Sequence, residues 1–117
     1  MNGNNLVVFR FGVMDTSGED FLARTRNATV IVEARAQLAL PPDKRVRIIT
    51  GLIHRVPLGS NLGWRWQHID SAWSFATFSI EVCDAMPSYV ESHLDEWLKG
   101  PGRFCPWSCH IKKEEAL

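Results

Sequence analysis

The sequence predicts a single α+β domain: a twisted, mainly antiparallel β-sheet with two α-helices, at about residues 28–40 and 87–98. Several short segments alternate apolar and polar side chains or are rich in β-branched residues, which is typical of strands. Two longer segments carry apolar residues at helical spacing and end at Pro or Gly. A chain of 117 residues is the size of one domain, which we expect to span residues 1–117.

The first third of the chain predicts a β-hairpin followed by a helix. Residues 6–14 and 20–26 are expected to be its strands, joined by a turn. The apolar face of the first strand comprises Val7, Phe9, Phe11 and Val13. Asn27 or Thr29 can cap the helix, and the Pro41-Pro42 pair ends it because proline cannot continue the hydrogen-bonding pattern.

The middle of the chain predicts a second, longer hairpin. Residues 46–56 are rich in β-branched side chains, and residues 64–69 alternate, so both are expected to be strands. The turn-rich segment 57–63 joins them. A register that pairs Arg55 with Arg65 is the arrangement we expect for this hairpin.

The last third predicts a strand over residues 73–83, a helix over residues 87–98 and a final extended segment over residues 103–112. The side chains expected to point inward from the strand are Phe78, Ile80 and Val82. Ser88 and Glu91 have the spacing of a capping box at the beginning of the helix.

Composition excludes several classes of function. Thirteen basic and thirteen acidic residues cancel, so no basic excess suggests a nucleic-acid partner. No apolar run approaches the roughly 20 residues needed to cross a bilayer, so membrane insertion is not expected. Residues 1–5 lack the basic and apolar regions of a signal peptide, which leaves a cytosolic protein or a mature domain with an added methionine.

Catalytic motifs are missing from the sequence. It contains no Gly-x-Ser-x-Gly elbow, no Gly-rich phosphate loop and no dinucleotide fingerprint, so we expect neither an enzyme nor a cofactor. The alternative is a small metal-dependent hydrolase. His68 and Asp70 would share one strand face, and the expected register places His54 diagonally from His68, about 7–8 Å away. Glu81 would approach from the next strand.

Three cysteines, Cys83, Cys105 and Cys109, lie in the last third of the chain. Zinc is disfavoured because His110 directly follows Cys109 and too few soft ligands lie nearby. In a secreted protein, a bridge between Cys83 and Cys105 is expected, whereas in the cytosol all three would be small buried apolar residues.

The loop and strand from residue 57 to residue 66 form the candidate binding site. Its residues are Leu58, Leu62, Trp64, Arg65 and Trp66. The chain has five tryptophans, of which a small core hides two or three, and exposed Trp and Arg are typical of protein interfaces. This predicts a protein or glycan partner. Two other interpretations stay open: the loop is only a connector, or the exposed tryptophans are buried in a homodimer.

The chain also resembles a family of small, largely uncharacterised bacterial α+β domains, many of which follow secretory signals. The residues that carry the resemblance are 80–85 (IEVCDA), 87–91 (PSYVE), 93–97 (HLDEW) and 105–108 (CPWS), with matches at 13–18 and 63–68. The resemblance implies a secreted or periplasmic domain with a disulfide between Cys83 and Cys105. It implies no catalytic residues, and Cys109 departs from its two-cysteine pattern.

Together these features predict a non-catalytic recognition module. One concrete form of this function is inhibition of a secreted enzyme, in which Leu58 or Leu62 occupies a pocket of the target. A disulfide would then add resistance to proteolysis.

Overall fold

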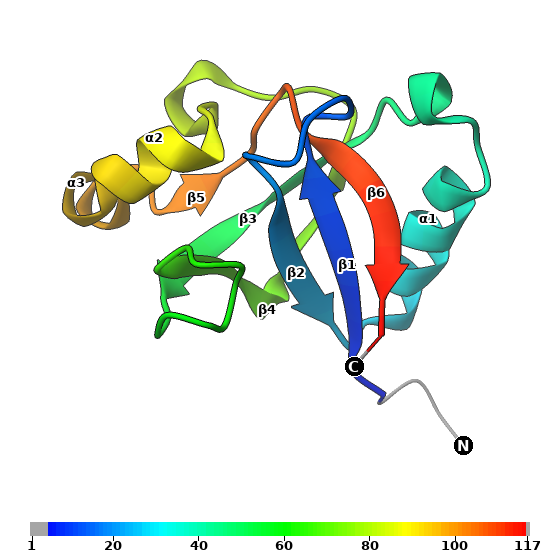
Figure 1. The fold of residues 1–117 in the computed structure, drawn as a ribbon, viewed down its shortest axis with the longest axis horizontal. Helices are drawn as coiled ribbons and strands as arrows, with labels where there is room; N and C mark the ends of the chain where they lie inside the picture. The colour runs from blue at the N-terminus through cyan, green and yellow to red at the C-terminus, as the bar shows by residue number, and fades with distance from the viewer. Residues whose placement is uncertain (1–4, 117) are drawn as a thin grey trace.

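Two antiparallel sheets pack face to face (Figure 1). The computed structural model describes residues 5–116, so residues 1–4 and 117 of the expected domain lie outside the described residues. The first sheet, in the order β2-β1-β6, consists of β1 (Val7–Gly12), β2 (Phe21–Thr25) and β6 (His110–Glu115). The second, in the order β4-β3-β5, consists of β3 (Ile48–Arg55), β4 (Trp66–Ala76) and β5 (Arg103–Phe104). The α+β class is confirmed, with two sheets instead of one.

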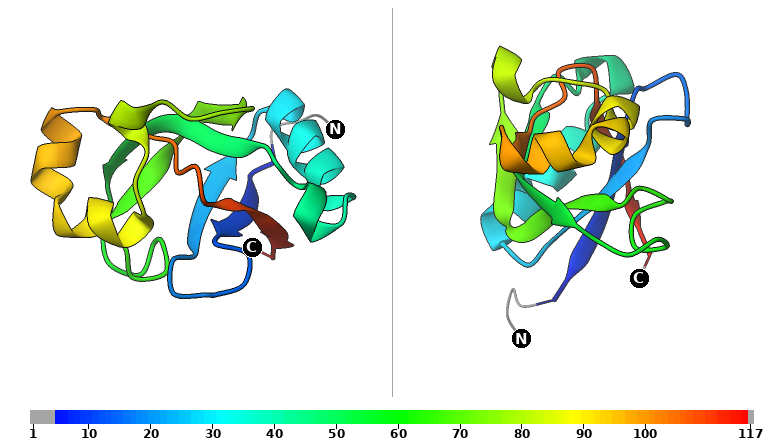
Figure 2. Two further views of the ribbon diagram at one scale, coloured as in Figure 1. Left: turned by 90° about the horizontal axis from the view of Figure 1, so that it is seen from above. Right: turned by 90° about the vertical axis from the view of Figure 1, so that its left-hand side faces the viewer.

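The helices lie at opposite ends of the two-layered sheet (Figure 2). The α-helices are α1 (Ala28–Leu38), α2 (Pro87–Ser92) and α3 (Leu94–Lys99). Two 3-10 helices, η1 (Pro42–Lys44) and η2 (Glu81–Cys83), complete the regular structure of the described chain. Asn27 caps α1 as predicted, because its side chain accepts a hydrogen bond from the Val30 N–H at 3.0 Å.

Aromatic rings fill the space between the two sheets. Phe11 and Phe21 of the first sheet stack with ring centroids 5.6 Å apart, and Trp66 meets Phe104 edge-on at 5.1 Å within the second. Phe21 bridges the layers by packing against Trp66 at 5.4 Å. Complete burial of one such side chain contributes about 1.5–3 kcal/mol to folding. This aromatic core therefore holds the two layers together.

One long strand, β4, replaces the two strands predicted at residues 64–69 and 73–83. The pairing of β3 with β4 is irregular between Gly51 and Ile53, where β4 bulges: Gly51 pairs with Trp73 and Ile53 with His68, so residues 69–72 lie opposite Leu52 alone. Gly51 is required there, because a Cβ atom would lie 2.4 Å from the Ala72 carbonyl oxygen. The close approach of the two strand backbones at Gly51 lets β4 continue past Asp70 and Ser71.

The segment after β4 turns away from the sheet, so Phe78, Ile80 and Val82 are exposed and the prediction of inward side chains was wrong. Pairing with β3 ends at the Ile48–Ala76 pair, which leaves no neighbouring strand for these residues. A hydrogen bond from the Cys105 N–H to the Cys83 carbonyl, 2.8 Å long, instead draws the chain toward the segment after β5.

The predicted helix 87–98 is two short helices, α2 and α3, separated at His93. The Ser92 hydroxyl donates to the Tyr89 carbonyl at 3.1 Å, which competes with continuation of the helix. The expected capping box is also replaced, because the Ser88 N–H donates to the carboxylate of Glu19 at 2.9 Å. Glu91 binds Arg65 instead.

Candidate functional site

The loop between β3 and β4, residues 57–65, projects beyond the ends of both strands (Figure 1), and it carries exposed apolar side chains. Leu58 is 71% exposed and Leu62 is 45% exposed. Both leucines are accessible to a partner without any rearrangement of the core. We call residues 57–65 the β3–β4 loop.

A buried asparagine anchors this loop to the first sheet. Asn61 is fully buried, and its side-chain oxygen accepts a hydrogen bond from the Leu22 N–H at 2.6 Å. Its amide nitrogen donates to the Trp66 carbonyl at 2.7 Å. Loss of a buried partner leaves a polar group unsatisfied, at a cost of about 1–3 kcal/mol for each group. Asn61 therefore fixes the middle of the loop between the two leucines.

Two turns give the loop its shape. The Ser60 N–H donates to the Pro57 carbonyl at 3.3 Å, and the Trp64 N–H donates to the Asn61 carbonyl at 2.9 Å. Gly63 has a φ of 93°, which glycine adopts at no steric cost, whereas Leu62 has a φ of 53°. A leucine in this sparsely populated conformation persists only where neighbouring contacts hold it, and such residues gather at functional sites.

The other three predicted contact residues are Trp64, Arg65 and Trp66. They support the loop and do not enlarge its exposed apolar surface. Trp66 is completely buried, which contradicts its expected exposure. Trp64 is half-buried, stacks on Trp66 at 5.9 Å and donates from Nε1 to the Asp20 carbonyl at 2.7 Å. Arg65 remains exposed but is paired with Glu91 of α2. The leucines therefore present the free apolar surface, and these residues form its base.

Some tryptophans are buried and others are exposed, as the composition predicts. Trp66, Trp73 and Trp97 are buried, whereas Trp107 is 51% exposed. Trp107 follows β5 and lies on a different segment from the β3–β4 loop. Its N–H donates to the Asp84 side chain at 2.8 Å. The exposed aromatic surface is therefore separate from the exposed leucines in the sequence and in its contacts.

The four residues of the alternative metal site are not brought together. The strand register pairs Ile53 with His68 and Arg55 with Trp66, instead of Arg55 with Arg65. His54 and His68 consequently point to opposite faces of the hairpin, and His54 is exposed while His68 is buried.

The two carboxylates of that alternative also have other surroundings. Asp70 is paired with Arg24 at 3.0 Å, and Glu81 lies in η2 beyond the end of β4. Among residues 5–116, no group of three His, Cys, Asp or Glu side chains could hold a metal ion. The register explains this result, because a shift of one residue moves a side chain to the other face.

His68 is a core residue with unusual electrostatics. Its Nε2 lies 2.9 Å from the Phe104 carbonyl, and its ring stacks on Phe104 at 5.7 Å. Nδ1 has no hydrogen-bond partner among the described residues. Burial lowers the pKa of His68 from 6.5 to about 4, because the charged ring would lose its hydration. His68 is therefore neutral at physiological pH.

Two of the three cysteines pair as the family resemblance implies. Cys83 and Cys105 form a disulfide with a Cα–Cα distance of 5.3 Å, within the range usual for such bonds. Cys109 is a buried free thiol, and burial raises its pKa to about 12. The thiol is therefore protonated and unreactive in the folded protein.

Sequence reasoning missed two residues that shape the site. Asn61 lies among Gly, Ser and Leu, a context that predicts an exposed turn residue, and only the fold brings Leu22 to it. Glu91 has the spacing of a capping box, yet its carboxylate holds Arg65 across 26 positions of sequence. Neither role leaves a local sequence signal.

Comparison with known proteins identifies a family. A family model described as the BP-74 N-terminal domain matches residues 6–117, which is nearly the whole chain. Neither the curated proteins nor the solved structures gave a match. Within the described part of the chain, every helix is too short or too polar to cross a membrane.

Proposed function

The chain belongs to the BP-74 N-terminal domain family, and we propose that it is a non-catalytic recognition module that binds a protein partner through its β3–β4 loop. The observation that carries this proposal is the combination of exposed Leu58 and Leu62 with fully buried Asn61 on one loop. An apolar side chain held outward on a fixed backbone is suited to insertion into a pocket.

Preorganisation of the loop favours binding. Ordering a flexible loop costs affinity, and a loop already fixed in its bound conformation avoids that cost. The hydrogen bonds of Asn61 and the pair between Arg65 and Glu91 hold the backbone on both sides of Leu62. Burial of each leucine in a partner would contribute about 1.5–3 kcal/mol before association costs.

The contact chemistry favours a protein partner over a glycan. Sugar rings bind on exposed aromatic faces, but Trp66 is buried and Trp64 is half-buried against it. The exposed apolar side chains of the β3–β4 loop are instead the aliphatic Leu58 and Leu62, and an aliphatic side chain fills an apolar pocket of a protein. Inhibition of a secreted enzyme is one form of this function, with Leu58 as the inserted side chain.

We place this function outside the cytoplasm of a bacterium. Disulfides persist in oxidising compartments, and the bond between Cys83 and Cys105 fits a secreted or periplasmic domain. The resemblance to domains that follow secretory signals supports the same location.

The test compares two double variants that remove similar apolar surface. Leu58→Ser with Leu62→Ser alters the loop, whereas Val32→Ser with Val46→Ser alters exposed apolar residues elsewhere. Each immobilised protein is incubated with the extracytoplasmic protein fraction of the source organism, and bound proteins are quantified by mass spectrometry. We expect a partner that the wild type and the control retain and the loop variant loses.

Two results would argue against the proposal. Equal retention by all three proteins would show that the leucines are not contact residues. Sedimentation velocity that finds a dimer for the wild type and a monomer for the loop variant would assign the leucines to self-association.

A further inference from the structure

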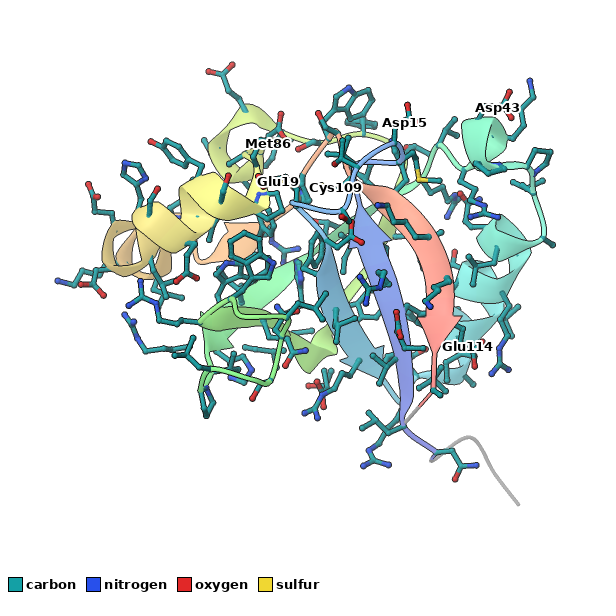
Figure 3. The ribbon with its side chains drawn as sticks, viewed as in Figure 1. Asp15, Glu19, Asp43, Met86, Cys109 and Glu114 are labelled. Atoms are coloured by element: carbon teal, nitrogen blue, oxygen red, sulfur yellow. A yellow bond between two sulfur atoms is a disulfide. The ribbon has the colours of Figure 1, made fainter. Side chains whose placement is uncertain are left out.

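A second surface, independent of the β3–β4 loop, lies between η2 and helices α2 and α3. It is a shallow groove of about 400 Å³. The residues that define it here are Glu81, Val82, Asp84, Met86, Tyr89 and Trp97. Figure 3 labels Met86 at the beginning of α2, near Glu19, and the Glu19 carboxylate accepts the Ser88 N–H of that helix. We call this surface the acidic groove.

The base of the groove is aromatic. Trp97 is anchored through its Nε1, which donates to the Arg103 carbonyl at 3.0 Å. The Tyr89 ring meets Trp97 edge-on, with centroids 6.1 Å apart, and stacks on His93 at 4.0 Å. These contacts fix the position of both rings and leave Tyr89 half exposed.

The opposite wall is held by covalent and polar links to the segment after β5. Cys83 is joined to Cys105 by the disulfide, and the Cys105 N–H donates to the Cys83 carbonyl. The Trp107 N–H donates to Asp84 at 2.8 Å. The groove is therefore formed in the absence of a partner, although η2, which forms this wall, lies outside both sheets.

The charge on this surface has one sign. From residue 66 to residue 98 the sequence contains no Lys or Arg, although the whole chain is neutral. The acidic residues in that range are Asp70, Glu81, Asp84, Glu91, Asp95 and Glu96. Three of them are neutralised by arginines from other elements. Glu81 and Asp84, which line the groove, form no ion pair among the described residues.

Large exposed apolar side chains lie on the two segments that carry or contact these carboxylates. Val82 is 67% exposed, and Phe78, Ile80 and Trp107 are exposed on the segments that the disulfide joins. Exposed apolar side chains grouped in this way are typical of an interaction site. Apolar surface beside unpaired carboxylates matches a partner with apolar and basic residues side by side.

We propose that the acidic groove binds a peptide segment of a partner protein in which Lys or Arg is flanked by large apolar side chains. The basic group lies between Glu81 and Asp84, and the neighbouring apolar side chains pack on Val82, Met86 and Trp97. Because the groove is preformed, binding needs no rearrangement of the domain. This site is distinct from the surface of the β3–β4 loop, and each can fail without the other.

The experiment begins with a displayed library of random twelve-residue peptides, selected on the immobilised domain. Selected peptides are synthesised and titrated by calorimetry against the wild type and three variants. Glu81→Gln with Asp84→Asn removes both groove charges, while the new asparagine keeps an oxygen for the Trp107 N–H. Asp43→Asn with Glu96→Gln is the matched control, because it removes two exposed carboxylates outside the groove. Leu58→Ser with Leu62→Ser tests for binding at the β3–β4 loop.

We expect the selected peptides to be enriched in Lys or Arg next to apolar residues. Their affinity should fall at least tenfold for the groove variant, fall with rising salt, and stay unchanged for the other two variants. The proposal is overturned by a selection that yields no binding peptide, by peptides without basic residues, or by equal affinity for the groove variant. Loss of affinity only in the Leu58→Ser, Leu62→Ser variant would place the peptide on the loop and overturn it as well.

Discussion

Acidification should destabilise this protein through a single buried imidazole, and replacement of His68 by glutamine should remove that effect. The glutamine side-chain nitrogen can donate to the Phe104 carbonyl, as His68 Nε2 does at 2.9 Å. Glutamine has no protonation equilibrium in this range. The pH dependence of wild type and His68→Gln should therefore differ by the contribution of His68 alone.

The magnitude follows from the pKa of His68, which burial lowers from 6.5 to about 4. The unfolded chain binds a proton at this histidine below pH 6.5, whereas the folded protein does not until about pH 4. Stability is therefore complete above pH 6.5 and is lost as the pH falls toward 4. One pH unit corresponds to about 1.36 kcal/mol, so the total loss is about 3 kcal/mol.

Urea denaturation at intervals between pH 7.5 and pH 4.5, followed by tryptophan fluorescence, measures this loss. By pH 4.5 the wild type should lose about 2–3 kcal/mol more unfolding free energy than His68→Gln. His54→Gln is the control, because it makes the same substitution at an exposed histidine. If His68→Gln loses stability as steeply as the wild type, His68 does not titrate in the way its burial requires.

Three further predictions concern the elements that position the two surfaces. Asn61→Ala should lower the unfolding free energy by about 2–4 kcal/mol, because the Leu22 N–H and the Trp66 carbonyl lose their partner, and denaturant titration measures this. Gly51→Ala should cost at least about 2 kcal/mol, since its Cβ would lie 2.4 Å from the Ala72 carbonyl oxygen; a thermal midpoint equal to that of the wild type would contradict the observed bulge. Cys83→Ser with Cys105→Ser opens a link between residues 22 positions apart and should cost about 3 kcal/mol, with proteolysis expected to begin in residues 77–86.

Local sequence patterns predicted the elements that depend on residues close together in the sequence. Alternation indicated β1, and Asn27 caps α1 as its residue type and position suggest. Such features depend on neighbours in the sequence, which a single chain displays directly.

Features set by distant residues were missed or misread. The sequence pattern did not show that β4 bulges out of its pairing with β3 and continues, and the exposure of Val82 depends on where β3 begins. The burial of Asn61 depends on Leu22, and the hairpin register separated two histidines that the alternative site required to be adjacent. Each error came from a contact between segments that the sequence pattern does not specify.

The candidate site was predicted in part. The leucines of the β3–β4 loop are exposed as expected, but Trp66 is buried because it faces the first sheet and packs against Phe21. The acidic groove was not predicted from the sequence, and Val82, which lines it, was assigned to an inward strand face.

Site-specific photo-crosslinking tests the role of the β3–β4 loop most directly. A benzophenone amino acid is placed at position 58 in one protein and at position 46, on an exposed surface elsewhere, in a second. Both are irradiated with the extracytoplasmic protein fraction of the source organism. We predict a discrete cross-linked product from position 58 that position 46 does not give. Products from position 46 alone, or none from position 58, would contradict recognition through this loop.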